Sequence, residues 1–166
     1  MQVQEEDKMQ RFLRQAREKM SYETFPQDLE QVLADGSKLI GPYVDYFKGK
    51  KYEYFDKYIV GAMEEFQGKE SILIKGKEKW FRYYNGEFVD KNFIDNAGEV
   101  FEFLKKALRE FPKDKPFRRG TNKLKIGDYT YTDRCIGTLE SFEGNEEILF
   151  RNKKIYALTY FGGVKS

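Results

Sequence analysis

Two segments of the chain carry apolar residues three and four positions apart, which is the spacing of an amphipathic helix. The first segment covers residues 5–20, and its apolar positions are Met9, Phe12, Leu13, Ala16 and Met20. The second covers residues 96–111, and its apolar positions are Val100, Phe101, Leu104, Ala107, Leu108 and Phe111. Asn96 and Glu99 have the spacing of a capping box, and Pro112 cannot continue a helix. The pattern predicts two helices, each with one buried face.

Outside these helices apolar and polar residues alternate, which is typical of strands with one buried face. The alternation predicts six strands, over residues 51–59, 64–74, 80–84, 129–136, 140–150 and 155–161. Residues 75–77 and the pair Asn85 and Gly86 have the composition of tight turns. Residues 29–34 are interpreted as a short helix in the connector before the first strand.

The two strand regions match each other in sequence. Residues 52–56 and 129–133 share two tyrosines and an aspartate, and residues 61–73 and 137–149 share glycines, glutamates and a phenylalanine at equal spacing. We therefore expect internal repeats over about residues 43–90 and 120–163, joined by the helix at 96–111. A three-strand unit with one helix is marginal alone. The match predicts an α+β fold in a single domain over residues 1–166. Its duplicated α-βββ units are related by a pseudo-twofold axis, and the helices pack on one face of an antiparallel sheet.

Composition excludes most catalytic and metal chemistry. The chain has no histidine and a single cysteine, Cys135. Histidine-based general acid–base catalysis, histidine-activated nucleophiles and histidine-ligated metal sites are therefore excluded. One cysteine allows neither an internal disulfide nor a zinc ribbon or iron–sulfur cluster. The sequence predicts no metal and no cofactor.

Charge gives no indication of a polymeric partner. The 30 basic and 28 acidic residues are interspersed, so we expect no nucleic-acid binding by this chain alone. The basic run at residues 113–125 lies among prolines and a glycine and is interpreted as a solvated loop. No apolar stretch reaches membrane-spanning length and residues 1–7 are polar, so we expect a cytoplasmic protein without a membrane contact. The oligomeric state, monomer or homodimer, is left open.

The repeats supply the first set of candidate ligand-binding residues. Strand alternation places Tyr52, Tyr54 and Asp56 on one face, and Tyr131 and Asp133 on the equivalent face of the second repeat. Tyrosines beside a carboxylate can line a pocket for a cationic or planar ligand. The alternative is that these are core tyrosines with satisfied hydroxyls and a carboxylate paired to a basic neighbour.

A second set comprises two glutamates and two aromatic residues. Glu70 and Glu146 each follow a glycine by two positions, and a glycine within a strand marks a bulge or a close backbone approach. The glutamates could bind a divalent cation or act as an acid–base pair. Alternatively they form a recurring salt bridge that each repeat needs for folding. Trp80 and Tyr84 lie on the closing strand, and Trp80 is predicted to be partly buried beside the ligand, with an ordinary core position as the alternative.

These motifs resemble those of a bacterial family known as domain of unknown function 5680. The resemblance covers nearly the whole chain, through residues 12–16, 35–38, 54–56, 66–70, 80–86, 107–118 and 156–163. The chain departs from the family pattern at Phe81 and Arg82, where relatives have a small residue and Met, and at Phe55, where relatives have a basic residue. Some relatives carry a helix-turn-helix domain, so the resemblance implies a sensing or regulatory role.

The leading hypothesis is a non-catalytic domain that binds a small molecule or serves in regulation, with the aromatic sheet between the repeats as its recognition surface. One alternative is a small enzyme that uses a carboxylate pair, Glu70 with Asp56 or Glu146. It requires a concave site with converging carboxylates of raised pKa. The other is a protein–protein interaction module, which should expose a contiguous apolar patch.

Overall fold

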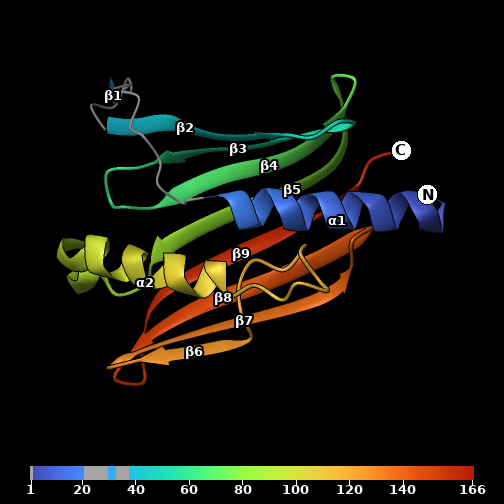
Figure 1. Ribbon diagram of the computed structural model, residues 1–166. Coiled ribbons are helices and arrows are strands. Elements are labelled where there is room, and N and C mark those ends of the chain that lie inside the picture. Colours follow the sequence, from blue (N-terminus) through green and yellow to red (C-terminus); the bar gives the residue numbers. More distant parts are fainter. Residues whose placement is uncertain (1, 21–29, 33–37) are drawn as a thin grey trace.

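A computed structural model of the protein describes residues 2–20, 30–32 and 38–166 (Figure 1). Helix α1 (Val3–Lys19) precedes strands β1 (Glu30–Val32), β2 (Lys38–Lys48), β3 (Tyr52–Val60), β4 (Phe66–Ile74) and β5 (Lys77–Phe88). A 3₁₀ turn (Lys91–Asn96) and helix α2 (Ala97–Arg109) follow, and the chain continues with β6 (Lys123–Ile126), β7 (Tyr129–Thr138), β8 (Ser141–Phe150) and β9 (Lys153–Val164).

The strands form one nine-stranded antiparallel sheet in the order β1-β2-β3-β4-β5-β9-β8-β7-β6. Each half is a meander, and the last strands of the two halves, β5 and β9, pair at the centre. We call β2–β5 the first half and β6–β9 the second half. The α+β class and the antiparallel sheet are confirmed. The pairing order is the same in both halves, while their equivalence as duplicated units stays a prediction.

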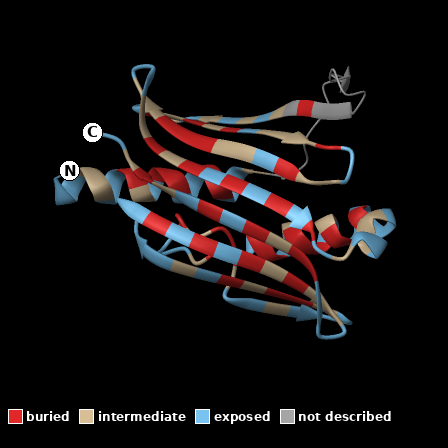
Figure 2. Cartoon of the chain, turned by 180° about the vertical axis from the view of Figure 1, so that it is seen from behind, coloured by how far each residue is buried: buried red, intermediate tan, exposed pale blue. Residues whose placement is uncertain are grey.

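Both helices lie on one face of the sheet, which we call the inner face (Figure 1). Most of the apolar positions that the helical spacing indicated are buried, among them Leu13 and Val100, which have no exposed surface. Met20 and Phe101 are only partly buried, and Arg17, Ala97 and Phe103 are buried in addition. Buried and exposed residues alternate along the strands (Figure 2), because successive side chains point in turn to the inner face and to the opposite, outer face. Period-two alternation along the strands thus reflects helix cover on one side only. No helix in the described ranges is long and apolar enough to span a bilayer.

The structure adds strands that periodicity did not predict. Each half begins with an additional strand, β2 or β6, so that each half has four strands instead of three. β6 occupies residues 123–126 at the sheet edge, within and just beyond the basic segment interpreted as a loop. Its side chains are largely exposed, so it lacks a hydrophobic signal. The short helix predicted over residues 29–34 is wrong for residues 30–32, which form β1, and its other residues lie outside the described ranges.

The predicted turn at Asn85 and Gly86 is also wrong, because both residues lie inside β5. Gly86 is required there for space rather than for a turn: a Cβ atom would lie 2.1 Å from the hydroxyl of Tyr156. The close approach of a large side chain from the neighbouring strand β9 explains a glycine in mid-strand. The turn at residues 75–76 is confirmed, with Lys75 and Gly76 both at positive φ.

One buried arginine ties α1 to the segment that follows α2. The guanidinium of Arg17 donates to the carbonyl oxygens of Pro116 (2.9 Å), Arg118 and Arg119, and it lies 4.0 Å from the centre of the Phe111 ring. Arg17 and Pro116 are 99 positions apart in the sequence. We call residues 112–122 the capping loop, because this arginine fixes the loop against the inner face.

Candidate functional site

A row of four charged residues crosses the inner face of the first half. Asp45 on β2 is paired with Asp56 on β3, Asp56 with Glu70 on β4, and Glu70 with Arg82 on β5. Directly opposite residues on antiparallel strands have Cβ atoms only about 4.5–5.5 Å apart, and like charges in such pairs are destabilising. The row holds three carboxylates and one guanidinium, so its charges do not balance within the sheet.

Arg82 and a tyrosine hydroxyl engage the Glu70 carboxylate. Arg82 donates from Nη2 to Oε1 at 2.6 Å and from Nε to Oε2, and the Tyr54 hydroxyl donates to Oε1. The third nitrogen, Nη1, donates to the carbonyl oxygen of Phe117 in the capping loop at 2.6 Å. Burial disfavours the charged form of Glu70, but the attraction of Arg82 outweighs burial and lowers the pKa to about 2. Glu70 is therefore ionised and held in place.

Asp56 lies beside Glu70 but has no cation of its own. Its exposed fraction is 7%, and Oδ1 accepts a hydrogen bond from the Tyr84 hydroxyl at 2.6 Å. No other described group donates to this carboxylate. Burial and the negative charge of Glu70 raise the pKa of Asp56 to about 8, against the opposing effects of Tyr84 and Arg119. Asp56 is therefore mainly protonated at neutral pH.

The position of Tyr84 depends on the glycine opposite it. A Cβ atom at Gly68 would lie 2.2 Å from Cζ of Tyr84, and one at Gly144 would lie 2.2 Å from Cζ of Tyr160. Both glycines therefore allow a tyrosine to lie flat over the strand and reach an aspartate. Of the two roles expected for a mid-strand glycine, close approach is the one found. Strand pairing is regular at both positions, and the register shifts occur further along, between Ile72 and Leu73 in the first half.

The second half repeats these tyrosine–carboxylate contacts. The Tyr131 hydroxyl donates to Oε1 of Glu146, as Tyr54 donates to Glu70. The Tyr160 hydroxyl donates to Oδ1 of Asp133 at 2.9 Å. Tyr131 and Tyr160 match Tyr54 and Tyr84 of the first half in sequence, and their hydroxyls donate to buried carboxylates. The alternative of core tyrosines with satisfied hydroxyls therefore describes their local environment.

The two halves take their arginine from different places. The residue paired with Glu146 on β9 is Leu158, whereas the residue paired with Glu70 on β5 is Arg82. Arg119 of the capping loop supplies the missing cation, and its Nε donates to Oε2 of Glu146 at 2.7 Å. The charge of Arg119 is therefore engaged by the second half.

The capping loop also covers Asp133. The backbone N–H of Gly120 donates to Oδ2 at 3.2 Å, and Nε of Arg118 lies 3.8 Å from the same oxygen. Burial and the charge of Glu146 raise the pKa of Asp133 to about 6, opposed by Gly120, Tyr160 and Arg118. The rise is smaller than for Asp56, in keeping with the additional donors.

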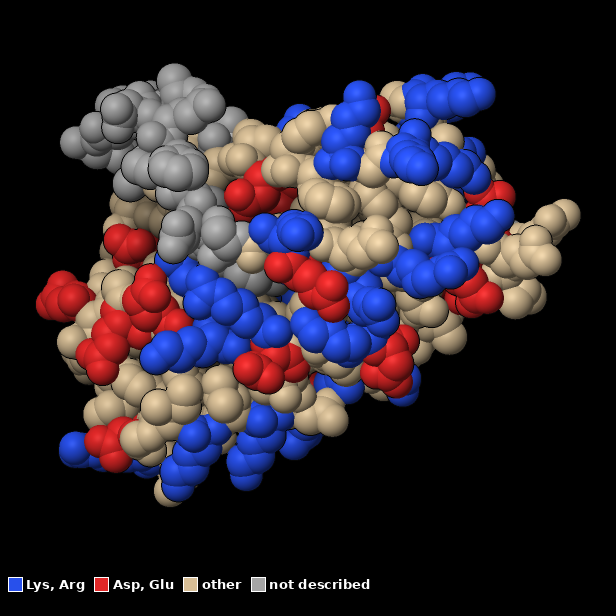
Figure 3. Space-filling view, in the orientation of Figure 1, with Lys and Arg blue, Asp and Glu red and all other residues tan. Residues whose placement is uncertain are grey.

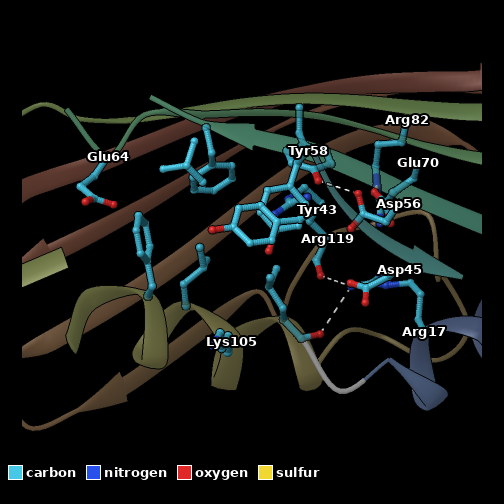
Figure 4. A pocket seen from close by; sticks show the side chains of 16 residues that line it. Arg17, Tyr43, Asp45, Asp56, Tyr58, Glu64, Glu70, Arg82, Lys105 and Arg119 are labelled. Atoms are coloured by element: carbon cyan, nitrogen blue, oxygen red, sulfur yellow. Dashed lines mark hydrogen bonds and ion pairs between the residues drawn. The ribbon is translucent and has the colours of Figure 1, made fainter. Parts of the chain in front are cut away.

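Above Asp56 the corresponding space is a cavity of about 280 Å³ between α2 and the first half of the sheet (Figure 4). Its polar lining comprises Arg17, Tyr43, Asp45, Asp56, Tyr58, Glu64, Glu70, Arg82, Tyr84, Lys105 and Arg119. Its apolar lining comprises Val60, Phe66, Phe101, Leu104 and Leu108. Figure 4 shows Asp56 at one end of the cavity and Glu64 at the other, with Tyr43 and Tyr58 between them. The two tyrosine rings are stacked, with centres 4.9 Å apart.

Three of the predicted ligand-binding residues, Asp56, Glu70 and Tyr84, line this cavity. Three others, Tyr131, Asp133 and Glu146, form the matching network of the second half. The remaining three, Tyr52, Tyr54 and Trp80, are buried and do not line it.

Trp80 has a core environment. It has no exposed surface, its Nε1 donates to the carbonyl oxygen of Leu139 at 3.2 Å, and its ring stacks on Phe142. The prediction of a partly buried position beside the ligand does not fit this environment, and we leave Trp80 out of the candidate site.

Several cavity residues were missed by sequence reasoning. Tyr43 and Asp45 lie on β2, where alternation begins but no strand was predicted. Arg17 lies between the apolar positions of the first predicted helix, and Arg119 falls within the basic run interpreted as a solvated loop. Only the alternation at residues 43–47 offered a signal for any of them.

No group of three or more His, Cys, Asp or Glu side chains in the described ranges is arranged to hold a metal ion. The surface that carries the helices shows basic and acidic side chains interspersed, without a field of one sign (Figure 3).

Comparison with known proteins gives one match. Searches of curated proteins and of solved structures returned no significant match. The model of the family described as domain of unknown function 5680 (DUF5680) matches residues 56–164, a region that extends from the cavity aspartate of β3 to the end of β9. The chain belongs to the DUF5680 family.

Proposed function

We propose that the protein binds a small molecule in the cavity between α2 and the first half of the sheet. The observation that carries the proposal is the difference between two aspartates in similar surroundings. Asp133 lies under the capping loop, which donates to it, whereas Asp56 faces a cavity lined by aromatic and charged side chains. A volume of about 280 Å³ is near the lower limit for ligand pockets, which suits a small metabolite. Binding without turnover is also what a sensing domain requires.

Thermal-shift screening of the full chain against a broad metabolite set tests the proposal, because a specific ligand stabilises the folded state by mass action. Val60→Trp places a large side chain in the cavity wall and should abolish the shift given by any true ligand. Ile136→Trp is the control, because Ile136 is 67% exposed on the second half. The proposal fails if no compound shifts the wild type, or if Val60→Trp leaves the shifts unchanged.

A second candidate function is acid–base chemistry by Asp56 and Glu70. The observation in its favour is that the pKa of Asp56 is raised and that of the neighbouring Glu70 is lowered, as in enzymes with two carboxylates in different roles. Against it, Glu70 is held by Arg82, and a raised aspartate pKa also occurs at the covered Asp133. We therefore favour binding without chemistry. Mass spectrometry of each stabilising compound after incubation with the protein decides between the two, since only an enzyme changes the compound.

The outer face offers little support for a protein-binding module. Its exposed aromatic residues include Tyr83 and Phe161, whose ring centres lie 5.6 Å apart, and Phe81 contacts both. Lys69 lies over the Tyr83 ring, and Lys165 over the Phe81 ring. Three rings, two of them with a lysine above the ring, form a small patch, whereas a protein interface needs a larger apolar centre.

A further inference from the structure

We propose that the ligand of the cavity is an organic cation, a small primary amine whose ammonium group lies between Asp45 and Asp56. This inference rests on the proposed function of the cavity and adds the charge and class of the ligand. It follows from the charges around the cavity, from its aromatic wall, and from the groups that approach the matching aspartate, Asp133, in the second half.

The first argument is the unbalanced row of carboxylates. Arg82 is engaged by Glu70 and the Phe117 carbonyl, so it does not neutralise Asp45 or Asp56. In the part of the chain that the structure describes, neither aspartate is within ion-pair distance of a basic side chain, and the two are directly opposite each other. A cation between them would supply the positive charge that this pair lacks, and it would allow Asp56 to ionise beside Asp45 without a like-charge contact.

The other cations of the cavity do not fill this role. Arg119 donates to Glu146 and lies over the Tyr84 ring, 4.4 Å from its centre. Arg17 donates to backbone carbonyls, and Lys105 on α2 donates to Glu102 at 2.9 Å. Each is thus engaged by another group. Arg119 also faces Asp56, but its charge opposes the rise of the Asp56 pKa without preventing it, and Arg119 donates no hydrogen bond to either aspartate.

The second argument is the aromatic wall next to these aspartates. The stacked rings of Tyr43 and Tyr58 lie along the cavity beyond Asp56 (Figure 4). Aromatic faces attract ammonium groups and the polarised carbon atoms beside them. The apolar side chains of Phe101, Leu104 and Leu108 on α2 form the opposite side and suit a short hydrocarbon body. The cavity therefore combines a carboxylate end with an aromatic and aliphatic body, as amine recognition requires.

The third argument is the second half, where the protein supplies its own cation. The guanidinium of Arg118 and the N–H of Gly120 approach Oδ2 of Asp133. In the first half, Oδ2 of Asp56 receives no hydrogen bond from any described group, and this side chain faces the cavity. An ammonium group at Asp56 would supply the charge and the N–H donors that the capping loop gives to Asp133.

Binding of the amine displaces a proton. Asp56 enters the reaction as the carboxylic acid and the ligand as the ammonium ion. The complex pairs carboxylate with ammonium, and the Asp56 proton is released to solvent. The groups that face Asp56 are Asp45 from β2, Glu70 from β4, Tyr84 from β5 and Arg119 from the capping loop. Affinity should therefore rise with pH up to about 8, where Asp56 ionises in the free protein.

The experiment compares amines with neutral and anionic compounds of the same skeleton. Propylamine, isopentylamine and benzylamine, the corresponding alcohols, and butyrate, 4-methylvalerate and phenylacetate are titrated into the full chain by calorimetry with EDTA present. At least one amine should bind, whereas the matching alcohol and carboxylate should bind on the order of tenfold more weakly or not at all. Affinity for the amine should increase on the order of tenfold or more from pH 6 to pH 8, with proton release measured in two buffers of different ionisation enthalpy.

A pair of matched aspartate variants tests whether Asp56 is the residue that binds the amine and releases the proton. Asp56→Asn should weaken amine binding on the order of tenfold or more and abolish proton release, whereas Asp133→Asn, under the capping loop, should change neither. The inference is overturned if no amine binds, if an alcohol or carboxylate binds as tightly as its amine, or if Asp56→Asn leaves affinity and proton release unchanged. Its failure is distinct from failure of the proposed function: a neutral or anionic metabolite blocked by Val60→Trp would retain the cavity as a binding site and reject the amine.

Discussion

The two halves of the sheet share a buried network and differ in what lies above it. In each half one tyrosine donates to a glutamate and another to an aspartate, and one arginine engages the glutamate. The capping loop fills the space over the second-half aspartate, and in the first half the matching aspartate opens into the cavity. A feature present in both halves is most simply explained by folding. The difference between the halves is therefore the better guide to function.

The origin of the arginine shows how the halves depend on each other. Arg82 lies in the sheet beside Glu70, whereas Glu146 relies on Arg119 from the capping loop, which Arg17 of α1 holds in place. The second half therefore needs α1 and the loop in position before its buried carboxylate is neutralised. The first half carries its cation within its own strands, and its aspartate faces the cavity.

The largest expected loss of stability comes from removing one of the two arginines that engage the buried glutamates. Arg82→Met and Arg119→Met should each lower the free energy of unfolding by about 3–5 kcal/mol, because each leaves a buried glutamate without its cation. Urea denaturation followed by circular dichroism measures both. The double variant Glu70→Gln with Arg82→Met should recover much of the loss, since no unpaired charge remains buried. If Arg119→Met has little effect while Arg82→Met is severe, the networks are not equivalent.

A smaller loss should follow from filling the space under the tyrosines. Gly68→Ala and Gly144→Ala should each destabilise the fold by about 1–3 kcal/mol, because a Cβ atom at either position overlaps the ring of Tyr84 or Tyr160. Gly98→Ala is the control: it lies in α2, where an added Cβ meets nothing, so it should be neutral or slightly stabilising. Thermal unfolding of the three variants gives the comparison. Equal losses at Gly68 and Gly144 would support the equivalence of the halves, and a loss at only one would argue against it.

The aspartates should differ in the pH dependence of stability. A pKa raised in the folded state favours folding below the unfolded-state pKa, and this advantage is lost as pH rises through the folded-state pKa. The stability contributed by protonated Asp56 therefore decreases as the pH rises to about 8, whereas that contributed by protonated Asp133 decreases only up to about pH 6. From pH 6 to pH 8, wild-type stability should therefore fall relative to Asp56→Asn by at least about 1 kcal/mol.

Over the same interval the difference between wild type and Asp133→Asn should change much less. Urea titrations at pH 6, 7 and 8 measure both differences. A flat difference for Asp56→Asn would show that Asp56 is already ionised at pH 6, contrary to the burial argument.

The smallest loss of stability is expected from removing the tyrosine hydroxyls that donate to the aspartates. Tyr84→Phe removes the described donor to Asp56 and should cost about 0.5–1.5 kcal/mol, whereas Tyr160→Phe should cost less because Gly120 still donates to Asp133. Tyr84 favours the charged form of Asp56, so its loss should also raise the aspartate pKa further, which carboxyl-carbon NMR can follow. A larger stability loss for Tyr160→Phe would contradict the view that the loop compensates.

Hydrophobic periodicity determined both helices and the six predicted strands, because it records which face of an element is buried. The residue types shared by the sequences of the two halves also indicated the tyrosines, aspartates and glutamates of the buried networks. Periodicity did not reveal β6, whose side chains are mostly exposed, nor that Gly86 lies within a strand beneath Tyr156. Those outcomes depend on neighbouring strands rather than on local sequence.

The location of the cavity was decided only by tertiary structure. Asp56 and Asp133 occupy matching positions in the sequences of the two halves, and no neighbouring residue in the sequence indicates which of the two aspartates is covered. That choice depends on Arg17, which contacts the capping loop across 99 positions of sequence, and on Arg119 and Arg118, which looked like surface charges in a loop. Side-chain contacts over such separations leave no periodic signal, because they are determined by how the helices and loop pack on the finished sheet.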